Sequence, residues 1–72
     1  MNTKSIKSFG LRVRGLREDR NWSQEDLAAE IGSRRQYISA IELGKTYPKY
    51  DLIERIAKAF GLTLAELFQE VN

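Results

Sequence analysis

The feature that most constrains the fold of this chain is a connection of only two residues between two short helical segments. The first segment, residues 24–31, follows Ser23, and an aspartate stands three residues later at the spacing of a capping box. Gly32 ends this segment. Ser33, with a glutamine at the same spacing, then predicts a second helix over residues 34–43. Two short helices joined so tightly cannot run back antiparallel, so we expect them to cross steeply.

Apolar residues at helical spacing predict three more helices around that pair. The first covers residues 7–20, the fourth covers residues 50–60, and the fifth begins after its cap, Thr63. No stretch alternates apolar and polar residues as a half-buried strand does. The sequence therefore predicts an all-α, five-helix fold with a helix-turn-helix in the second and third helices. Residues 1–72 form one domain, in which residues 1–6 are expected to be a flexible tail.

Composition argues against most catalytic chemistry. The 72 residues contain no cysteine and no histidine, so the chain lacks thiolate ligands, disulfides and the commonest general base. It also lacks a phosphate-binding loop, a dinucleotide fingerprint and a nucleophile elbow. We therefore expect no enzyme activity, metal, cofactor or small-molecule effector. Without a long apolar run or a signal segment, we expect no membrane contact and a cytoplasmic location.

Positive charge gathers where the third helix is predicted to begin. Arg34 and Arg35 stand in its first turn, where two cations oppose the helix macrodipole. They are either solvated surface residues or, as we favour, residues that a nucleic acid requires. In the major groove, arginine suits the O6 and N7 edge of guanine, and Gln36 beside them suits adenine. Residues 1–35 carry eight basic and five acidic side chains, whereas the remainder carries four and five.

The segment WSQEDLAAEIGSRRQYISAIELGK, residues 22–45, resembles the lambda-repressor-like family of phage and bacterial regulators. The resemblance spans about residues 9–68 and rests on single residues at fixed offsets: Phe9, Gly10, Arg12, Leu16, Arg17, Ser23, Gln24, Asp26, Leu27, Ala28, Gly32, Ile38, Ser39, Ile41, Glu42, Gly44, Lys45, Pro48, Ile56, Ala57, Leu67 and Phe68. It implies a transcription regulator that binds double-stranded operator DNA as a homodimer.

The resemblance also implies roles for residues of the helix-turn-helix. Arg35, Gln36 and Ala40 fall at base-reading positions, where the methyl group of Ala40 suits thymine. The expected contacts to the DNA backbone come from seven residues: Ser23, Gln24, Arg34, Tyr37, Ser39, Lys45 and Thr46. For Tyr37 the core, an interface and a phosphate contact all remain open. Gln24 has a plain alternative as an exposed residue in a first helical turn.

One further charged pair is implied to be structural. In the family, an arginine of the first helix pairs with a glutamate at the end of the third, and these positions hold Arg17 and Glu42 here. A glutamate close to the groove would otherwise repel phosphate. We therefore expect the two side chains to form an internal ion pair.

The last helix predicts how two copies meet. Leu64, Phe68 and Val71 form an apolar stripe on a helix with little chain left to cover it. Either all of them pack inward or, as we favour, they join two copies, with Tyr47 as the next candidate. Leu67 closes a hydrophobic staple and is expected in the core. Since one short domain makes few base contacts, two copies on a palindromic or pseudopalindromic site are expected.

Several kinds of short regulator match this description. The run from Arg35 to Ser39 is similar to that of the controller proteins of restriction–modification systems, which we place first. Phage Cro-like repressors and antitoxins of toxin–antitoxin pairs are similar in length. The alternative from another class is a protein-interaction module that presents Arg34 and Arg35 to an acidic partner.

Overall fold

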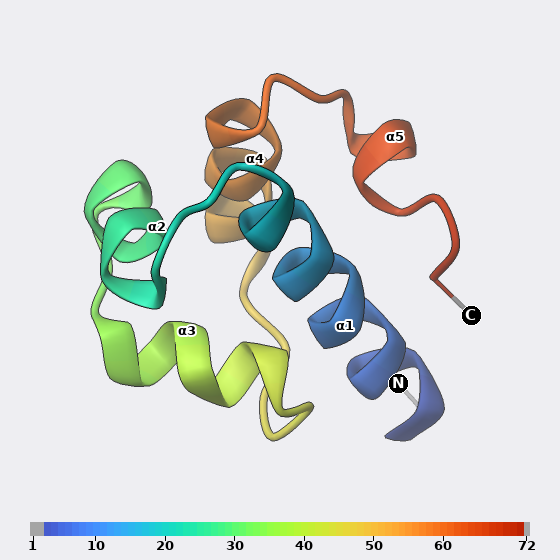
Figure 1. Ribbon diagram of the computed structural model, residues 1–72. Helices are drawn as coiled ribbons and strands as arrows, with labels where there is room; N and C mark the ends of the chain where they lie inside the picture. Colours follow the sequence, from blue (N-terminus) through green and yellow to red (C-terminus); the bar gives the residue numbers. More distant parts are fainter. Residues whose placement is uncertain (1–2, 72) are drawn as a thin grey trace.

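The computed structural model describes residues 3–71, and its regular elements are all helices (Figure 1). They are, in chain order, α1 (Thr3–Asp19), α2 (Gln24–Ile31), α3 (Arg35–Glu42), α4 (Tyr50–Ala59) and α5 (Leu64–Leu67). α1 and α2 both pack against α3, while α4 contacts α2 and α5. No strand occurs within the described residues, so the all-α, five-helix prediction is confirmed. None of these helices is both long enough and apolar enough to cross a bilayer.

Side-chain caps start α2 and α5 as predicted. The hydroxyl of Ser23 accepts a hydrogen bond from the backbone N–H of Asp26 at 3.0 Å, and the carboxylate of Asp26 accepts one from the N–H of Ser23 at 2.8 Å. Thr63 and Glu66 repeat this exchange at 3.1 and 2.9 Å. Each capping box satisfies N–H groups that a helix start leaves without an intrahelical acceptor.

The predicted cap of α3 was wrong. Its N-cap is Arg34, in an extended conformation and without a side-chain hydrogen bond, so Ser33 does not cap the helix. Ser33 instead stabilises the end of α2, because its N–H donates to the carbonyl oxygen of Ala28 at 2.8 Å. Gly32, with φ at 66°, supplies the left-handed residue that this ending requires. The two turn residues therefore stabilise the end of α2, and they do not cap the start of α3.

The outer bounds of the first and last helices also differ from the prediction. α1 begins at Thr3, so residues 3–6 of the expected tail are helical, and residues 1–2 lie outside the described residues. Lys7, in the second turn of this helix, packs against Gly44 in the loop that follows α3. α5 has a single turn, Leu64–Leu67, so Phe68 and Val71 follow the helix instead of extending it.

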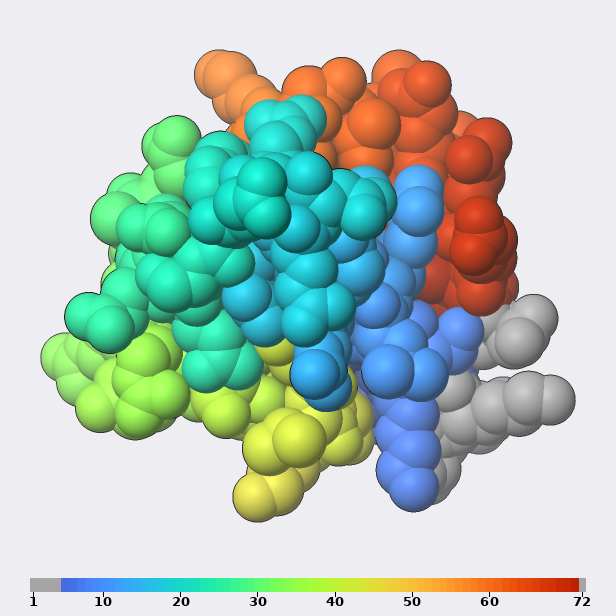
Figure 2. Space-filling view, viewed as in Figure 1, coloured from blue at the N-terminus to red at the C-terminus, as the bar shows by residue number. Residues whose placement is uncertain are grey.

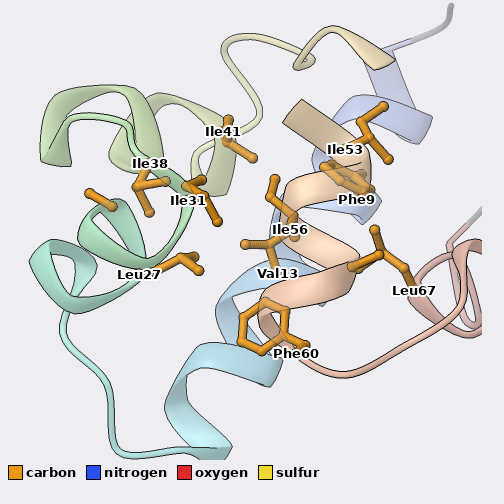
Figure 3. Close-up of a cluster of buried hydrophobic side chains, with 12 residues drawn as sticks. Phe9, Val13, Leu27, Ile31, Ile38, Ile41, Ile53, Ile56, Phe60 and Leu67 are labelled. Atoms are coloured by element: carbon orange, nitrogen blue, oxygen red, sulfur yellow. The ribbon is translucent and has the colours of Figure 1, made fainter. Parts of the chain in front are cut away.

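The core draws on all five helices (Figure 3). Its buried apolar side chains are Phe9, Val13, Leu27, Ala28, Ile31, Ile38, Ile41, Ile53, Ile56, Ala57, Phe60 and Leu67. Trp22 closes one side of this cluster, with its ring stacked on that of Phe60 at a centroid distance of 5.5 Å. This single cluster holds α2 and α3 in a fixed crossing and leaves their outer faces to solvent.

α1 crosses α3 at a glycine. A Cβ atom at Gly10 would overlap the carbonyl oxygen of Ile41 and would lie 2.8 Å from that of Glu42. The backbones of the two helices therefore approach more closely than any other residue at this position would allow. This contact sets how far the end of α3 lies from α1.

Three arginines hold the C-terminal ends of helices. Arg12 donates to the carbonyl oxygens of Leu67 and Glu66 at 3.2 and 2.8 Å, next to the end of α5. Arg20 donates to the carbonyl oxygen of Phe60 at 2.6 Å, after α4. Arg55 likewise donates to the carbonyl oxygen of Ile31, at the end of α2, at 3.5 Å. Helix C-termini carry partial negative charge and unpaired carbonyls, which a guanidinium group satisfies.

Candidate nucleic-acid interface

α3 lies along one edge of the molecule, at the bottom of Figures 1 and 2. Its inner face buries Ile38 and Ile41 in the core. Its start presents Arg34, Arg35 and Gln36 to solvent. Since the fold holds the inner face in place, the exposed first turn has a fixed direction. A helix in this position can enter a major groove with that turn foremost.

The other residues predicted to touch DNA lie on α3, at the start of α2 and in the loop after α3. Ser23 and Lys45 are exposed, whereas five more are half-buried: Gln24, Tyr37, Ser39, Ala40 and Thr46. Tyr37 packs partly against the core, which leaves only part of its side chain accessible. The hydroxyl of Ser23 is occupied by its capping role.

The cations at this edge are not neutralised by carboxylates of the described residues. The ion pairs found within residues 3–71 join Arg14 to Glu18 and Arg17 to Glu42, and neither involves Arg34, Arg35 or Lys45. Positive side chains held without an acidic partner create a potential that attracts anions.

Arg17 and Glu42, the two residues expected to pair, lie in direct contact between α1 and α3. The Nε and Nη2 atoms of Arg17 donate to the two carboxylate oxygens of Glu42 at 2.7 and 3.0 Å. The side chains are 12% and 4% exposed, so water hardly screens the pair. The remaining Nη1 atom donates to the carbonyl oxygen of Trp22 at 2.7 Å. The hydrogen bond to Glu42 raises the pKa of Arg17 above its ordinary value.

Gln24 connects this buried pair to the exposed start of α3. Its Nε2 atom donates to the carboxylate of Glu42 at 3.1 Å, and its Oε1 atom accepts from Nη1 of Arg35 at 3.4 Å. The carboxylate can only accept, so it fixes which end of the amide faces Arg35. The amide nitrogen has a second hydrogen, which leaves one donor for a phosphate. Sequence reasoning missed this link because it joins residues of two different helices, α2 and α3.

A further basic residue lies at the same edge and was not predicted there. Lys7 of α1 is exposed, and a Cβ atom at Gly44 would lie 2.6 Å from its Cγ atom and 3.0 Å from its Cα atom. Its stem therefore covers the glycine in the loop that follows α3. No local pattern could have shown this contact, because the two residues lie far apart in the chain.

The residues predicted to join two copies are only partly covered by the core. Leu64, Phe68, Val71 and Tyr47 are all half-buried, whereas Leu67 is fully buried. Phe9 lies between two of these rings, at centroid distances of 4.9 Å from Tyr47 and 5.2 Å from Phe68.

The rings of Tyr47 and Phe68 are therefore both anchored within the chain by their contact with Phe9. Burial raises the pKa of the Tyr47 hydroxyl. Leu64 is placed differently, because it lines an open groove between α4 and α5 together with Ala57 and Leu62.

Comparison with known proteins agrees with this geometry. A family model described as helix-turn-helix matches residues 13–67. The chain belongs to the lambda-repressor-like helix-turn-helix family. In this helix-turn-helix protein the matched range runs from the middle of α1 to the end of α5 and includes the whole edge formed by α3.

Relatives of this helix-turn-helix protein include named control proteins. Control protein C.MunI of a Mycoplasma species is 39% identical over 73 residues, which cover 100% of this chain and 97% of that one. Control protein C.BamHI of Bacillus amyloliquefaciens is 45% identical over 60 residues, or 82% and 74% of the two chains. The crystal structure of the restriction-modification controller protein C.AhdI from Aeromonas hydrophila has a TM-score of 0.83 at 35% identity, covering 88% and 96%.

Proposed function

We propose that this chain is a transcription regulator that binds operator DNA by placing the first turn of α3 in the major groove. The observation that carries the proposal is the exposed pair Arg34 and Arg35, which has no acidic partner within residues 3–71. Two arginines at a helix start oppose its dipole and weaken the helix. An anionic partner explains why they stand there. Membership in the helix-turn-helix family supports the same conclusion.

Within this proposal the exposed residues divide into two roles. Arg35, Gln36 and Ala40 read base edges, because arginine and glutamine match guanine and adenine and a methyl group matches thymine. The contacts that position the protein on the DNA backbone come from Ser23, Gln24, Arg34, Tyr37, Ser39, Lys45 and Thr46. The start of α2 favours a phosphate, since its N–H groups and dipole both attract anions.

A salt titration of duplex binding tests the function as a whole. The binding constant is measured for a random duplex and for a duplex selected from a random library. For a DNA-binding protein, the logarithm of the constant falls linearly and steeply with the logarithm of salt concentration, and the selected duplex binds more tightly at every salt concentration. No binding to either duplex would reject this function and favour the protein-interaction module.

Arg35→Ala is expected to weaken binding to the selected duplex by about 1–3 kcal/mol and to relax the preference for one guanine. The neighbouring Arg34→Ala is the matched control, because it removes the same charge from a backbone-contacting position. Arg34→Ala should weaken binding equally on all DNA sequences. Selection of duplexes by each variant measures both effects. An equal loss on every sequence for Arg35→Ala would remove Arg35 from base reading.

We also propose that two copies bind together on a palindromic or pseudopalindromic operator. Leu64 lies in the groove between α4 and α5, with apolar surface still open to solvent. A two-fold axis through this face would bring the residue against its own copy. Such a dimer directs both copies of α3 to the same side of the duplex, about one helical turn apart.

Leu64→Asp should produce a folded monomer that binds the palindromic site about 100-fold more weakly, because a half-site alone makes too few contacts. Like charges would approach each other at the two-fold axis. Sedimentation measures the assembly and circular dichroism the helix content. The dimer is wrong if the unmodified chain stays monomeric yet binds a lone half-site as tightly as the palindrome. Lost helicity in the variant would place Leu64 in the core instead.

The named relatives support a more specific proposal, that the chain is a restriction–modification controller. Two of them are control proteins, and C.MunI matches almost end to end. The regulated genes would then encode a methyltransferase and an endonuclease. Binding of the purified chain to the promoter region of adjacent genes of this kind is the test. Genes of a toxin or a phage beside it would favour an antitoxin or a Cro-like repressor.

A further inference from the structure

The DNA-facing edge does not end with the helix-turn-helix. α1 crosses the last turn of α3 at Gly10, whose neighbours are the carbonyl groups of Ile41 and Glu42. Lys7 stands about one turn nearer the start of α1. It therefore lies past the end of α3, over the loop at Gly44. Figure 1 shows the start of α1 beside this loop, at the same edge as α3.

Gly44 gives Lys7 its position. With φ at 73°, the glycine adopts a left-handed conformation, and a side chain there would collide with the stem of the lysine. The apolar part of Lys7 thus rests on the loop backbone, while the residue remains exposed. Long basic side chains commonly pack their stems in this way and keep the charged group in water.

The charge of Lys7 is not matched by a carboxylate in the described part of the chain, since neither ion pair found there includes it. The nearby Glu42 is fully engaged by Arg17 and Gln24. Lys45 follows Gly44 directly and is also exposed without an ion pair. Two lysines from distant parts of the sequence therefore flank one glycine.

We propose that Lys7 binds a DNA phosphate next to the one bound by Lys45, which extends the contact surface from the helix-turn-helix onto α1. This inference rests on the proposed DNA-binding function. A lysine ammonium is a compact point charge that suits a phosphate oxygen. Because Lys7 lies beyond α3, its contact is with the backbone and carries no sequence preference.

The test compares Lys7→Met with the charge-conserving variant Lys7→Arg. Methionine keeps an unbranched apolar stem to pack on Gly44 and removes only the charge. Arginine keeps the positive charge at the same position, so any difference between the two variants reports the charge of residue 7 alone. Both are titrated with salt at concentrations where sedimentation shows the same assembly as the unmodified chain.

Lys7→Met should bind about fivefold more weakly for each lost contact at physiological salt, equally on selected and random duplexes, and its salt slope should fall by about 0.9 per contact. Lys7→Arg should keep both the affinity and the salt slope of the unmodified chain. Unchanged binding by Lys7→Met, or a loss confined to one sequence, would overturn the contact and leave the proposed function intact. Absent duplex binding by the unmodified chain would instead reject the function.

Discussion

Glu42→Ala should lower the free energy of unfolding by about 3–5 kcal/mol, because it leaves the charge of Arg17 buried without a counterion. Arg17 would keep only its hydrogen bond to the carbonyl oxygen of Trp22. Gln24 would lose its acceptor as well. Arg17→Ala should lower the free energy of unfolding by a similar amount, since the carboxylate of Glu42 would then be the uncompensated buried charge. Urea unfolding followed by circular dichroism measures both.

The chain supplies its own control for this prediction. Arg14 and Glu18 form an ion pair at 3.2 Å, but their side chains are 56% and 53% exposed. Glu18→Ala should therefore change stability by no more than about 1 kcal/mol. A combined Arg17→Met and Glu42→Leu variant should lose less than either alanine variant, because no buried charge remains. Equal stability of Glu42→Ala and Glu18→Ala would contradict a structural role for the buried pair.

The second large effect is expected at Gly10. Gly10→Ala should destabilise the protein by about 3 kcal/mol, at the upper end of overpacking effects, because the new methyl group meets rigid backbone instead of a movable side chain. Relief requires α1 to move away from the carbonyl groups of Ile41 and Glu42. Thermal unfolding followed by circular dichroism at the helix signal measures the loss.

Gly15→Ala serves as the opposite case on the same helix. Nothing lies within 4 Å of a Cβ atom at Gly15, so alanine there should stabilise α1 by about 0.5–1 kcal/mol through its higher helix propensity. The two substitutions add the same methyl group and should shift the melting temperature in opposite directions. A Gly10→Ala protein as stable as Gly15→Ala would contradict the close crossing of α1 and α3.

The parts of the fold that sequence reasoning predicted correctly depend on neighbouring residues. Capping boxes and terminal glycines act within four or five residues, so their patterns located α2 and α5. Ser33 was misassigned because one residue can satisfy either the end of α2 or the start of α3. The two choices look the same in the sequence.

What could not be predicted depends on contacts between distant segments. Gly10 looks like a weak point in a helix until the carbonyl groups of α3 are seen against it. The link from Glu42 through Gln24 to Arg35 and the position of Lys7 likewise require the assembled fold. The pairing of Arg17 with Glu42 was expected only because of the family resemblance, since nothing in their spacing indicates it.

The arginines at helix ends affect how the molecule meets DNA before it binds. Arg12, Arg20 and Arg55 each lie on the partial negative charge of a helix C-terminus, which offsets part of their own field. Arg34 and Arg35, at the start of α3, have no such offset within the described residues and therefore contribute their full positive charge to the α3 edge. The negative charge of a duplex then rotates the approaching protein as well as attracting it. With the proposed interface, we expect most encounters to begin with α3 already turned toward the duplex, which shortens the rotational search that limits association.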